Sequence, residues 1–230
     1  MALNFTTVGA SSELSGVKML VYGKAGRGKT MLCGTAPTPI ILSAEAGLLS
    51  LARDPATATI PVITIKTVED LTEAFNWCQS SNDAKQFQTI CLDSISEIGE
   101  VVLANAKKQV KDPRQAYGEL IEKMTHLIRC FRDLQGFHVY MSAKQEFNQD
   151  AVTGVNQYGP SMPGAKLSQQ IPYFFDELFQ LDIGKTPEGV EYRYLRTQPD
   201  FQYDAKDRSG SLDAIEQPNL TNIIQKILTK

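Results

Sequence analysis

Short apolar runs alternate with helix-like segments through the first two thirds of the chain. The apolar runs are rich in β-branched residues or flanked by turn residues, which predicts strands over residues 17–22, 40–43, 59–65, 89–92 and 139–142. Between them, apolar residues recur at helical spacing over residues 68–78, after a Thr67 cap, and over residues 117–131. This alternation predicts an α/β fold with a mostly parallel central sheet flanked by helices.

The pattern changes after residue 142. Residues 148–165 are rich in Gly, Asn, Gln and Pro and lack periodicity, which predicts a long loop. Residues 177–183 and 190–197 predict a C-terminal β-hairpin, and apolar residues between 220 and 228 predict a final helix. The chain shows no internal repeat and no linker. We therefore expect one domain over residues 17–230, preceded by an N-terminal arm, residues 1–16, as a candidate oligomerisation segment.

Charge restricts the class of partner. The 230 residues include 23 Lys and Arg against 26 Asp and Glu, a net charge of -3, which excludes a uniformly basic nucleic-acid coat. Any phosphate-binding surface must be local or be formed by several copies. A hydrophobic fraction of 42% excludes a disordered chain. The N-terminus lacks a signal-peptide pattern and no apolar run reaches the ~20 residues of a membrane span, so we expect a cytoplasmic protein.

The cysteines and histidines form no ligand set. The four cysteines lie far apart without a C-x-x-C pair, which favours buried thiols over a disulfide or a zinc site. We expect His126 and His138 to be structural or surface residues.

A phosphate-binding motif follows the first predicted strand. Residues 23–30, GKAGRGKT, match G-x-x-x-x-G-K-[ST] between a strand and a helix, the context that this motif requires. Its glycines let successive N–H groups approach a triphosphate. Lys29 would reach the β- and γ-phosphates, and the Thr30 hydroxyl would bind Mg²⁺. The predicted ATP-binding residues are Gly23, Lys24, Ala25, Gly26, Arg27, Gly28, Lys29, Thr30 and Met31.

Two carboxylates follow other predicted strands. Asp93 ends the apolar run at 89–92 and is, with Thr30, the predicted Mg²⁺ ligand. Hydrolysis also needs a base, and Ser94 occupies the position after Asp93, where many P-loop ATPases have Glu. Glu45 follows the strand at 40–43, and parallel strands bring their carboxyl ends to one edge of the sheet. Glu45 is therefore the predicted base, and Glu97 is the alternative.

With its P-loop, its Asp93-Ser94 pair and Glu45, the chain resembles the RecA/RadA superfamily of P-loop NTPases from about residue 17 to residue 230. Within it, the chain resembles phage-encoded RecA-like ATP-binding proteins associated with single-strand annealing and recombination. The resemblance implies a RecA-like core, in which Glu45 activates the attacking water. It also implies that Gln145 senses the γ-phosphate and connects to a DNA-binding loop, with Ser142 and Lys144 as alternatives.

The same resemblance extends to both ends of the chain. Residues 206–210, KDRSG, resemble the K-x-R-x-G element with which RadA-like proteins reach into a neighbouring protomer's ATP site, which implies such a role for Lys206 and Arg208. The alternative for this segment is a solvated turn. Residues 5–8, FTTV, resemble an F-x-x-A docking peptide, although Val8 replaces the small residue. The chain leaves no room for the additional terminal domain of RecA-type recombinases, so strand exchange is not expected.

Two segments have the composition of a single-stranded DNA site. The first, residues 107–117, contains four cations and Tyr117, and the second, residues 147–165, begins with Phe147 and contains Tyr158. Cations follow phosphates while aromatic rings stack on bases. A charged helix end beside an ordinary loop is the alternative.

The sequence thus predicts a Mg²⁺-dependent ATPase that oligomerises as a ring or filament, binds single-stranded DNA in recombination or annealing, and is stimulated by DNA. The alternative from another class is a nucleotide-gated adaptor, such as a helicase loader or assembly factor, with little hydrolysis. A small-molecule kinase is disfavoured because no Arg-rich lid follows the motif.

Overall fold

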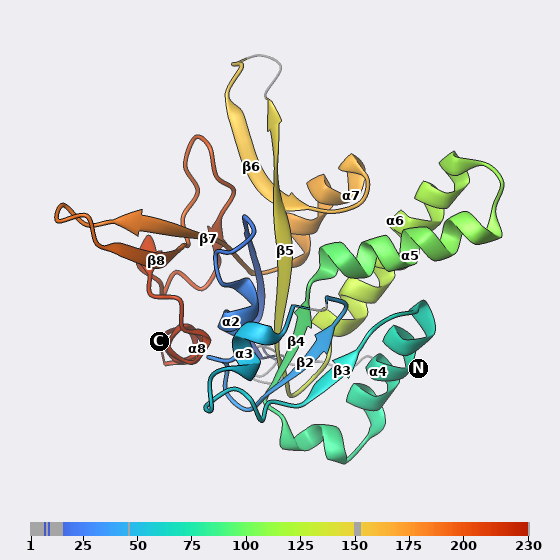
Figure 1. Cartoon of the computed structure of the whole chain (residues 1–230), viewed down its shortest axis with the longest axis horizontal. Coiled ribbons are helices and arrows are strands. Elements are labelled where there is room, and N and C mark those ends of the chain that lie inside the picture. Colours follow the sequence, from blue (N-terminus) through green and yellow to red (C-terminus); the bar gives the residue numbers. More distant parts are fainter. Residues whose placement is uncertain (1–6, 8, 10–15, 46, 150–152, 230) are drawn as a thin grey trace.

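A ten-stranded mixed sheet forms the centre of the computed structural model, which describes residues 7, 9, 16–45, 47–149 and 153–229 (Figure 1). The predicted N-terminal arm, with its FTTV segment, lies outside the described residues except for Thr7, Gly9 and Gly16. The strands follow the order β10-β8-β7-β1-β5-β4-β2-β3, with β6 paired to β5 and β9 paired to β7. The order places β5 and β7 on either side of β1.

Six neighbouring strands of this sheet are parallel, as the sequence predicts. They are β1 (Lys18–Gly23), β2 (Pro39–Ser43), β3 (Val62–Thr64), β4 (Thr89–Asp93), β5 (His138–Gln149) and β7 (Glu177–Lys185). The third strand is shorter than the predicted 59–65. In this register Ser43 lies beside Asp93, so the carboxyl ends of β2 and β4 meet at one edge.

Helices bury both faces of the sheet, which explains why its central strands are apolar throughout rather than alternating. One face carries α4 (Val68–Ser80), α5 (Ile95–Gln109) and α6 (Pro113–Arg132). The other face carries three shorter helices, α2 (Lys29–Cys33), α3 (Leu49–Ala52) and α8 (Leu220–Leu228). Along β1, Leu20 and Tyr22 point into the first core, whereas Met19 and Val21 point into the second.

The predicted caps and C-terminal elements are present. Thr67 caps α4 in a capping box with Asp70. β7 and β8 (Glu191–Arg196) form the predicted hairpin. Two short strands, β9 (Lys206–Asp207) and β10 (Ile215–Glu216), add to β7 and β8. Asp83–Gln86 forms a short 3-10 helix, η1.

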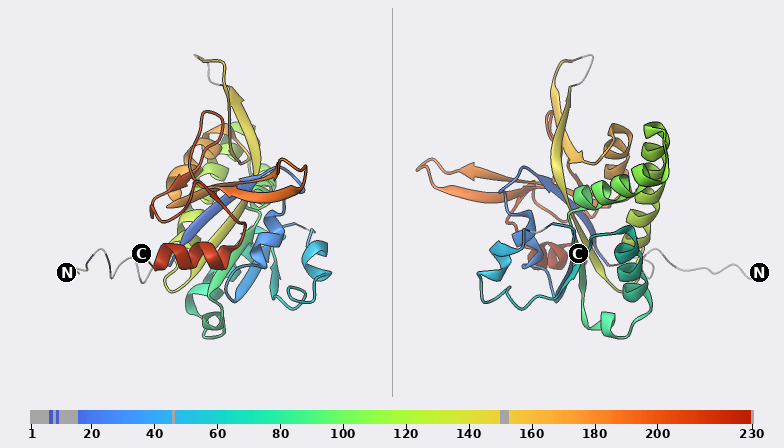
Figure 2. Two further views of the ribbon diagram at one scale, coloured as in Figure 1. Left: turned by 90° about the vertical axis from the view of Figure 1, so that its left-hand side faces the viewer. Right: turned by 45° about the vertical axis from the view of Figure 1, so that its right-hand side comes forward.

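The prediction of a long loop over residues 148–165 is wrong. β5 continues to Gln149 and pairs antiparallel with β6 (Asn156–Ser161), and α7 (Ala165–Gln170) and the 3-10 helix η2 (Ile171–Phe174) follow. Figure 2 shows these two strands extending beyond the sheet. In this β5–β6 extension, residues 144–149 and 156–161, most side chains are polar and only Pro160 is buried. The extension therefore has no apolar periodicity from which strands could be predicted.

Three of the four cysteines are buried in the core, and His138 forms a hydrogen bond to the backbone. The four cysteines are free thiols: Cys33, Cys78 and Cys91 are buried and Cys130 is half-buried. His138 is structural, because its Nδ1 accepts a hydrogen bond of 3.0 Å from the Val17 amide. Among the described helices, none is long and apolar enough to cross a membrane.

Candidate functional site

A cleft of about 600 Å³ opens where the carboxyl ends of β1, β2, β4 and β5 meet. Its lining contains most of the predicted P-loop together with Glu45, Asp93 and Gln145. Parallel packing brings these groups together although they are far apart in the sequence. Binding crevices of α/β proteins lie at this end of the strands.

The P-loop glycines are required by the local geometry. Gly28 has a φ of 106°, a left-handed conformation that side chains disfavour. A Cβ at Gly23 would lie 2.5 Å from the Leu181 carbonyl oxygen of the neighbouring strand β7. The loop is therefore fixed both by its own torsion angles and by β7.

The Lys29 amine folds back onto the loop. Its Nζ donates hydrogen bonds to the carbonyl oxygens of Gly23 at 2.9 Å and Lys24 at 3.1 Å. Burial lowers the pKa of Lys29, while the nearby Asp93 and Glu45 carboxylates oppose this shift. The amine thus occupies the mouth of the loop, where a phosphate would offer it a charged partner.

Asp93 is the most connected carboxylate of the cleft. It is only 2% exposed. Thr30 Oγ1 donates to its Oδ2 at 2.7 Å, and Ser142 Oγ donates to its Oδ1. Hydroxyl and carboxylate oxygens are the ligands that Mg²⁺ prefers, so the predicted pair of Thr30 and Asp93 fits this ion.

Glu45 lies in the same cleft, half-buried, and is held by the residue after Asp93. Ser94 Oγ donates to Glu45 Oε1 at 2.6 Å. The alternative base, Glu97, forms an ion pair with Lys144 and is not part of the cleft lining. The geometry therefore favours Glu45 over Glu97 as the group that faces a bound nucleotide.

Gln145 also lines the cleft, and its Oε1 is buried without a hydrogen-bond partner among the described residues. A buried polar atom without a partner is costly, so a hydrogen-bond donor bound in the cleft would stabilise Gln145. The two alternatives are already engaged, because Ser142 bonds Asp93 and Lys144 pairs with Glu97. Of the three candidates on β5, Gln145 is thus the one whose side-chain oxygen lacks a partner among the described residues.

Residues 15–209 match the model of the AAA_24 family, an AAA domain. The chain belongs to this family. AAA_24 membership and the strand order confirm the predicted α/β P-loop NTPase fold, with a mostly parallel central sheet flanked by helices and a C-terminal β-hairpin.

Two solved structures are similar to this AAA_24 chain over most of its length. The flagellar accessory protein FlaH from Methanocaldococcus jannaschii is 10% identical, with a TM-score of 0.48, covering 88% of this chain and 84% of FlaH. The RadB recombinase is 16% identical, with a TM-score of 0.45, covering 89% of this chain and 91% of RadB. Among curated proteins, none matches the chain by sequence.

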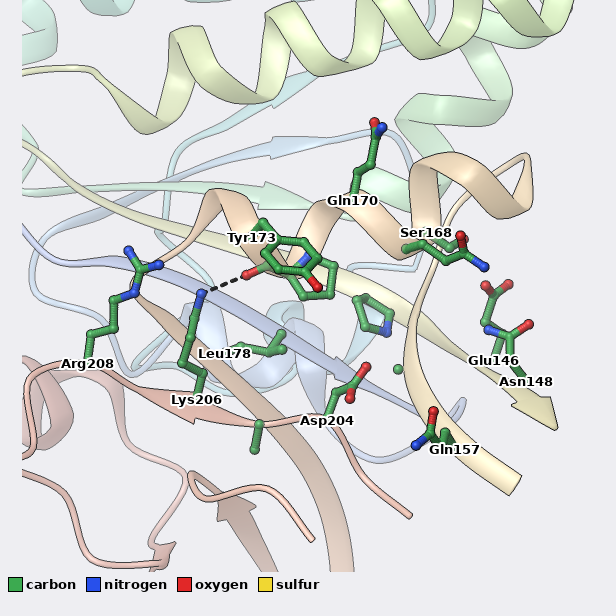
Figure 3. A pocket seen from close by; sticks show the side chains of 15 residues that line it. Glu146, Asn148, Gln157, Ser168, Gln170, Tyr173, Leu178, Asp204, Lys206 and Arg208 are labelled. Atoms are coloured by element: carbon green, nitrogen blue, oxygen red, sulfur yellow. Dashed lines mark hydrogen bonds between the residues drawn. The ribbon is translucent and has the colours of Figure 1, made fainter. Parts of the chain in front are cut away.

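Lys206 and Arg208 are not brought to the P-loop cleft of their own chain. They line a separate cavity of about 740 Å³, shown in Figure 3. There Lys206 Nζ donates to the Pro172 carbonyl oxygen at 2.7 Å, and Arg208 pairs with Asp176 at 2.9 Å. Burial, with Arg208 nearby, lowers the pKa of Lys206. Any role of these two cations at a nucleotide requires a second protomer.

Sequence reasoning misses the roles of two polar residues in the AAA_24 site. In the sequence Ser94 marks only the absence of a second carboxylate, yet in the structure it holds Glu45. Arg193 of β8 lines the cleft and donates from Nε to the Arg27 carbonyl oxygen at 3.0 Å. Nothing in the sequence distinguishes Arg193 from other exposed strand arginines, because the contact joins residues 166 positions apart.

Replacement of Lys29 by alanine should weaken ATP binding by roughly 100-fold or more, because it removes the flexible cation aimed at the β- and γ-phosphates while leaving the loop backbone intact. Titration calorimetry with ATP measures this. Lys85→Ala, which removes an exposed amine from η1, is the matched control. Unchanged ATP affinity in Lys29→Ala would show that the P-loop assignment is wrong.

Proposed function

We propose that this AAA_24 protein binds ATP with Mg²⁺ and hydrolyses it in the cytoplasm. The observation that carries the proposal is the joint placement of Lys29, Asp93 and Glu45 in one cleft, with Asp93 bonded to Thr30 at 2.7 Å. This is the set of groups that phosphoryl transfer to water requires: a phosphate cradle, an ion site and a base.

Each residue has a distinct part in this proposal. Backbone amides of the P-loop bind the phosphates, and Lys29 moves from the loop carbonyls to the β- and γ-phosphates. Thr30 and Asp93 would hold Mg²⁺, an ion that would supply charge neutralisation for the phosphoryl group. Glu45 accepts a proton from the attacking water, and the hydrogen bond from Ser94 orients its carboxylate.

Glu45→Gln should preserve ATP binding but slow hydrolysis by ~10²-fold or more, because an amide cannot accept the proton of the water. Glu97→Gln is the matched control and should hydrolyse ATP at nearly the wild-type rate, since Glu97 pairs with Lys144. Single-turnover hydrolysis and ATP binding are measured separately. If Glu97→Gln is the slow variant and Glu45→Gln is not, the base is misassigned.

We further propose that the β5–β6 extension binds single-stranded DNA, as in recombination or annealing. Phe147, Tyr158 and Tyr203 lie in a row that we call the aromatic stack. Tyr158 stacks on Tyr203 with ring centroids 5.0 Å apart, and the Phe147 ring is tilted by 53° to Tyr158 at 6.1 Å. The Arg196 guanidinium lies 5.1 Å from the Tyr203 centroid. Phe147, at the end of this stack, is 61% exposed. Stacked rings beside a cation are the composition of a sequence-tolerant single-strand site.

The first predicted DNA segment, residues 107–117, is a helix–helix corner rather than a loop. It comprises the end of α5, residues 110–112 and the start of α6. Lys107 Nζ lies 5.7 Å from the Tyr117 ring centroid. A Cβ added at Gly164, which precedes α7, would lie 3.4 Å from that ring. The cations of this corner therefore adjoin the segment that follows β6, which supports one binding surface rather than two.

ATP turnover with and without single-stranded DNA tests this part of the proposal. DNA should stimulate turnover, and Phe147→Ala should weaken DNA binding about tenfold, measured by fluorescence anisotropy, because one stacking platform is lost. Phe201→Ala, which removes a 90% exposed ring outside the stack, is the matched control. Absence of both DNA binding and stimulation would favour a nucleotide-gated adaptor.

Oligomerisation would bring Lys206 and Arg208 to the nucleotide site of a neighbouring copy of the chain. Arg208 is exposed and is not part of the lining of its own P-loop cleft. It lies at the start of a loop that Asp207 holds through the amides of Gly210 and Leu212. We propose that these cations reach the nucleotide of a neighbouring copy, where they would stabilise phosphoryl charge. Light scattering with and without ATP measures the assembly, and a chain that stays monomeric with ATP would contradict this.

A further inference from the structure

The β7–β8 hairpin lies directly against the P-loop. β7 runs parallel to β1, with Tyr22 beside Gln180, so the continuation of β7 passes the residues that follow β1. The close approach of Leu181 to Gly23 leaves no room for a side chain between them. Residues of this hairpin are therefore positioned by the same packing that fixes the loop.

Two contacts join the β7–β8 hairpin to Arg27 of the P-loop. Asp182 of β7 forms an ion pair of 3.0 Å with Nε of Arg27. Arg193 of β8 donates from Nε to the Arg27 carbonyl oxygen at 3.0 Å. A Cβ added at Gly28 would lie 3.3 Å from Nε of Arg193, so the guanidinium covers Gly28 at the rim of the cleft.

The charge of Arg193 is not neutralised. Asp182, the nearest carboxylate on the facing strand, is paired with Arg27, and Arg193 forms no ion pair within the described part of the chain. Arg193 is also the single arginine among the described residues that line the cleft. Its two terminal nitrogens have the planar fork geometry that binds phosphate oxygens in pairs.

We infer that Arg193 is a nucleotide-binding residue that the hairpin supplies in cis, and that its guanidinium contacts the phosphates of the nucleotide in the P-loop. The inference rests on the proposed ATP binding and adds a residue to that site. It differs from the proposed role of Arg208, which acts on another protomer's nucleotide. The single bond to the Arg27 carbonyl positions the guanidinium at the rim before the nucleotide arrives.

Arg193→Gln separates charge from position, because glutamine keeps an N–H donor for the Arg27 carbonyl but carries no charge. Titration calorimetry with ADP and with ATP should show about 10- to 100-fold weaker binding for Arg193→Gln and Arg193→Ala alike. The difference from wild type should shrink as sodium chloride is raised, since the contact is ionic. Lys185→Ala is the control, because it removes a 67% exposed cation from the same hairpin outside the cleft lining.

Wild-type affinity in Arg193→Gln would overturn the inference, whether or not Arg193→Ala is impaired, because Arg193 would then only brace the loop. A loss of affinity that is independent of salt would overturn it as well. Lys29→Ala reports on the proposed function separately. If Lys29→Ala weakens ATP binding and Arg193→Gln does not, only this inference fails; if Lys29→Ala binds ATP normally, the proposed function fails.

Discussion

The buried carboxylate of Asp93 organises the site. A carboxyl group with 2% exposure is tolerated only when hydrogen bonds replace its water, and Thr30 and Ser142 supply them. These two hydroxyls come from α2 and β5, so one side chain on β4 joins the P-loop helix to the neighbouring strand. The P-loop, the proposed ion site and the start of the β5–β6 extension are thereby held in one arrangement.

A single strand, β5, contributes residues both to the cleft and to the β5–β6 extension. β5 carries Ser142 at Asp93, Gln145 in the cleft and Phe147 in the aromatic stack, within six residues. β5 therefore joins the proposed nucleotide site at Gln145 to the proposed DNA site at Phe147. This continuity gives the proposed DNA stimulation a structural route. On the other side of β1, β7 and Arg193 brace the same loop.

The site residues that belong to short sequence motifs could be predicted from the sequence. The P-loop, Asp93 and Glu45 each follow a strand that is apolar on both faces, and the parallel topology then brings them to one edge. The extension was missed because β6 is held by backbone hydrogen bonds to β5, which leave no apolar pattern. Arg193 was missed because its contact with Arg27 depends on how β7 packs against β1. Such a long-range polar contact has no local sequence counterpart.

A Mg²⁺ titration of ATP turnover in Asp93→Asn measures whether Asp93 and Thr30 form the ion site of an ATPase. Asparagine keeps the shape of the side chain and one of its two acceptor oxygens but removes the charge that favours the cation. Asp93→Asn should need at least about tenfold more Mg²⁺ for half-maximal turnover while still binding ATP. A Mg²⁺ requirement equal to that of the wild type would contradict it.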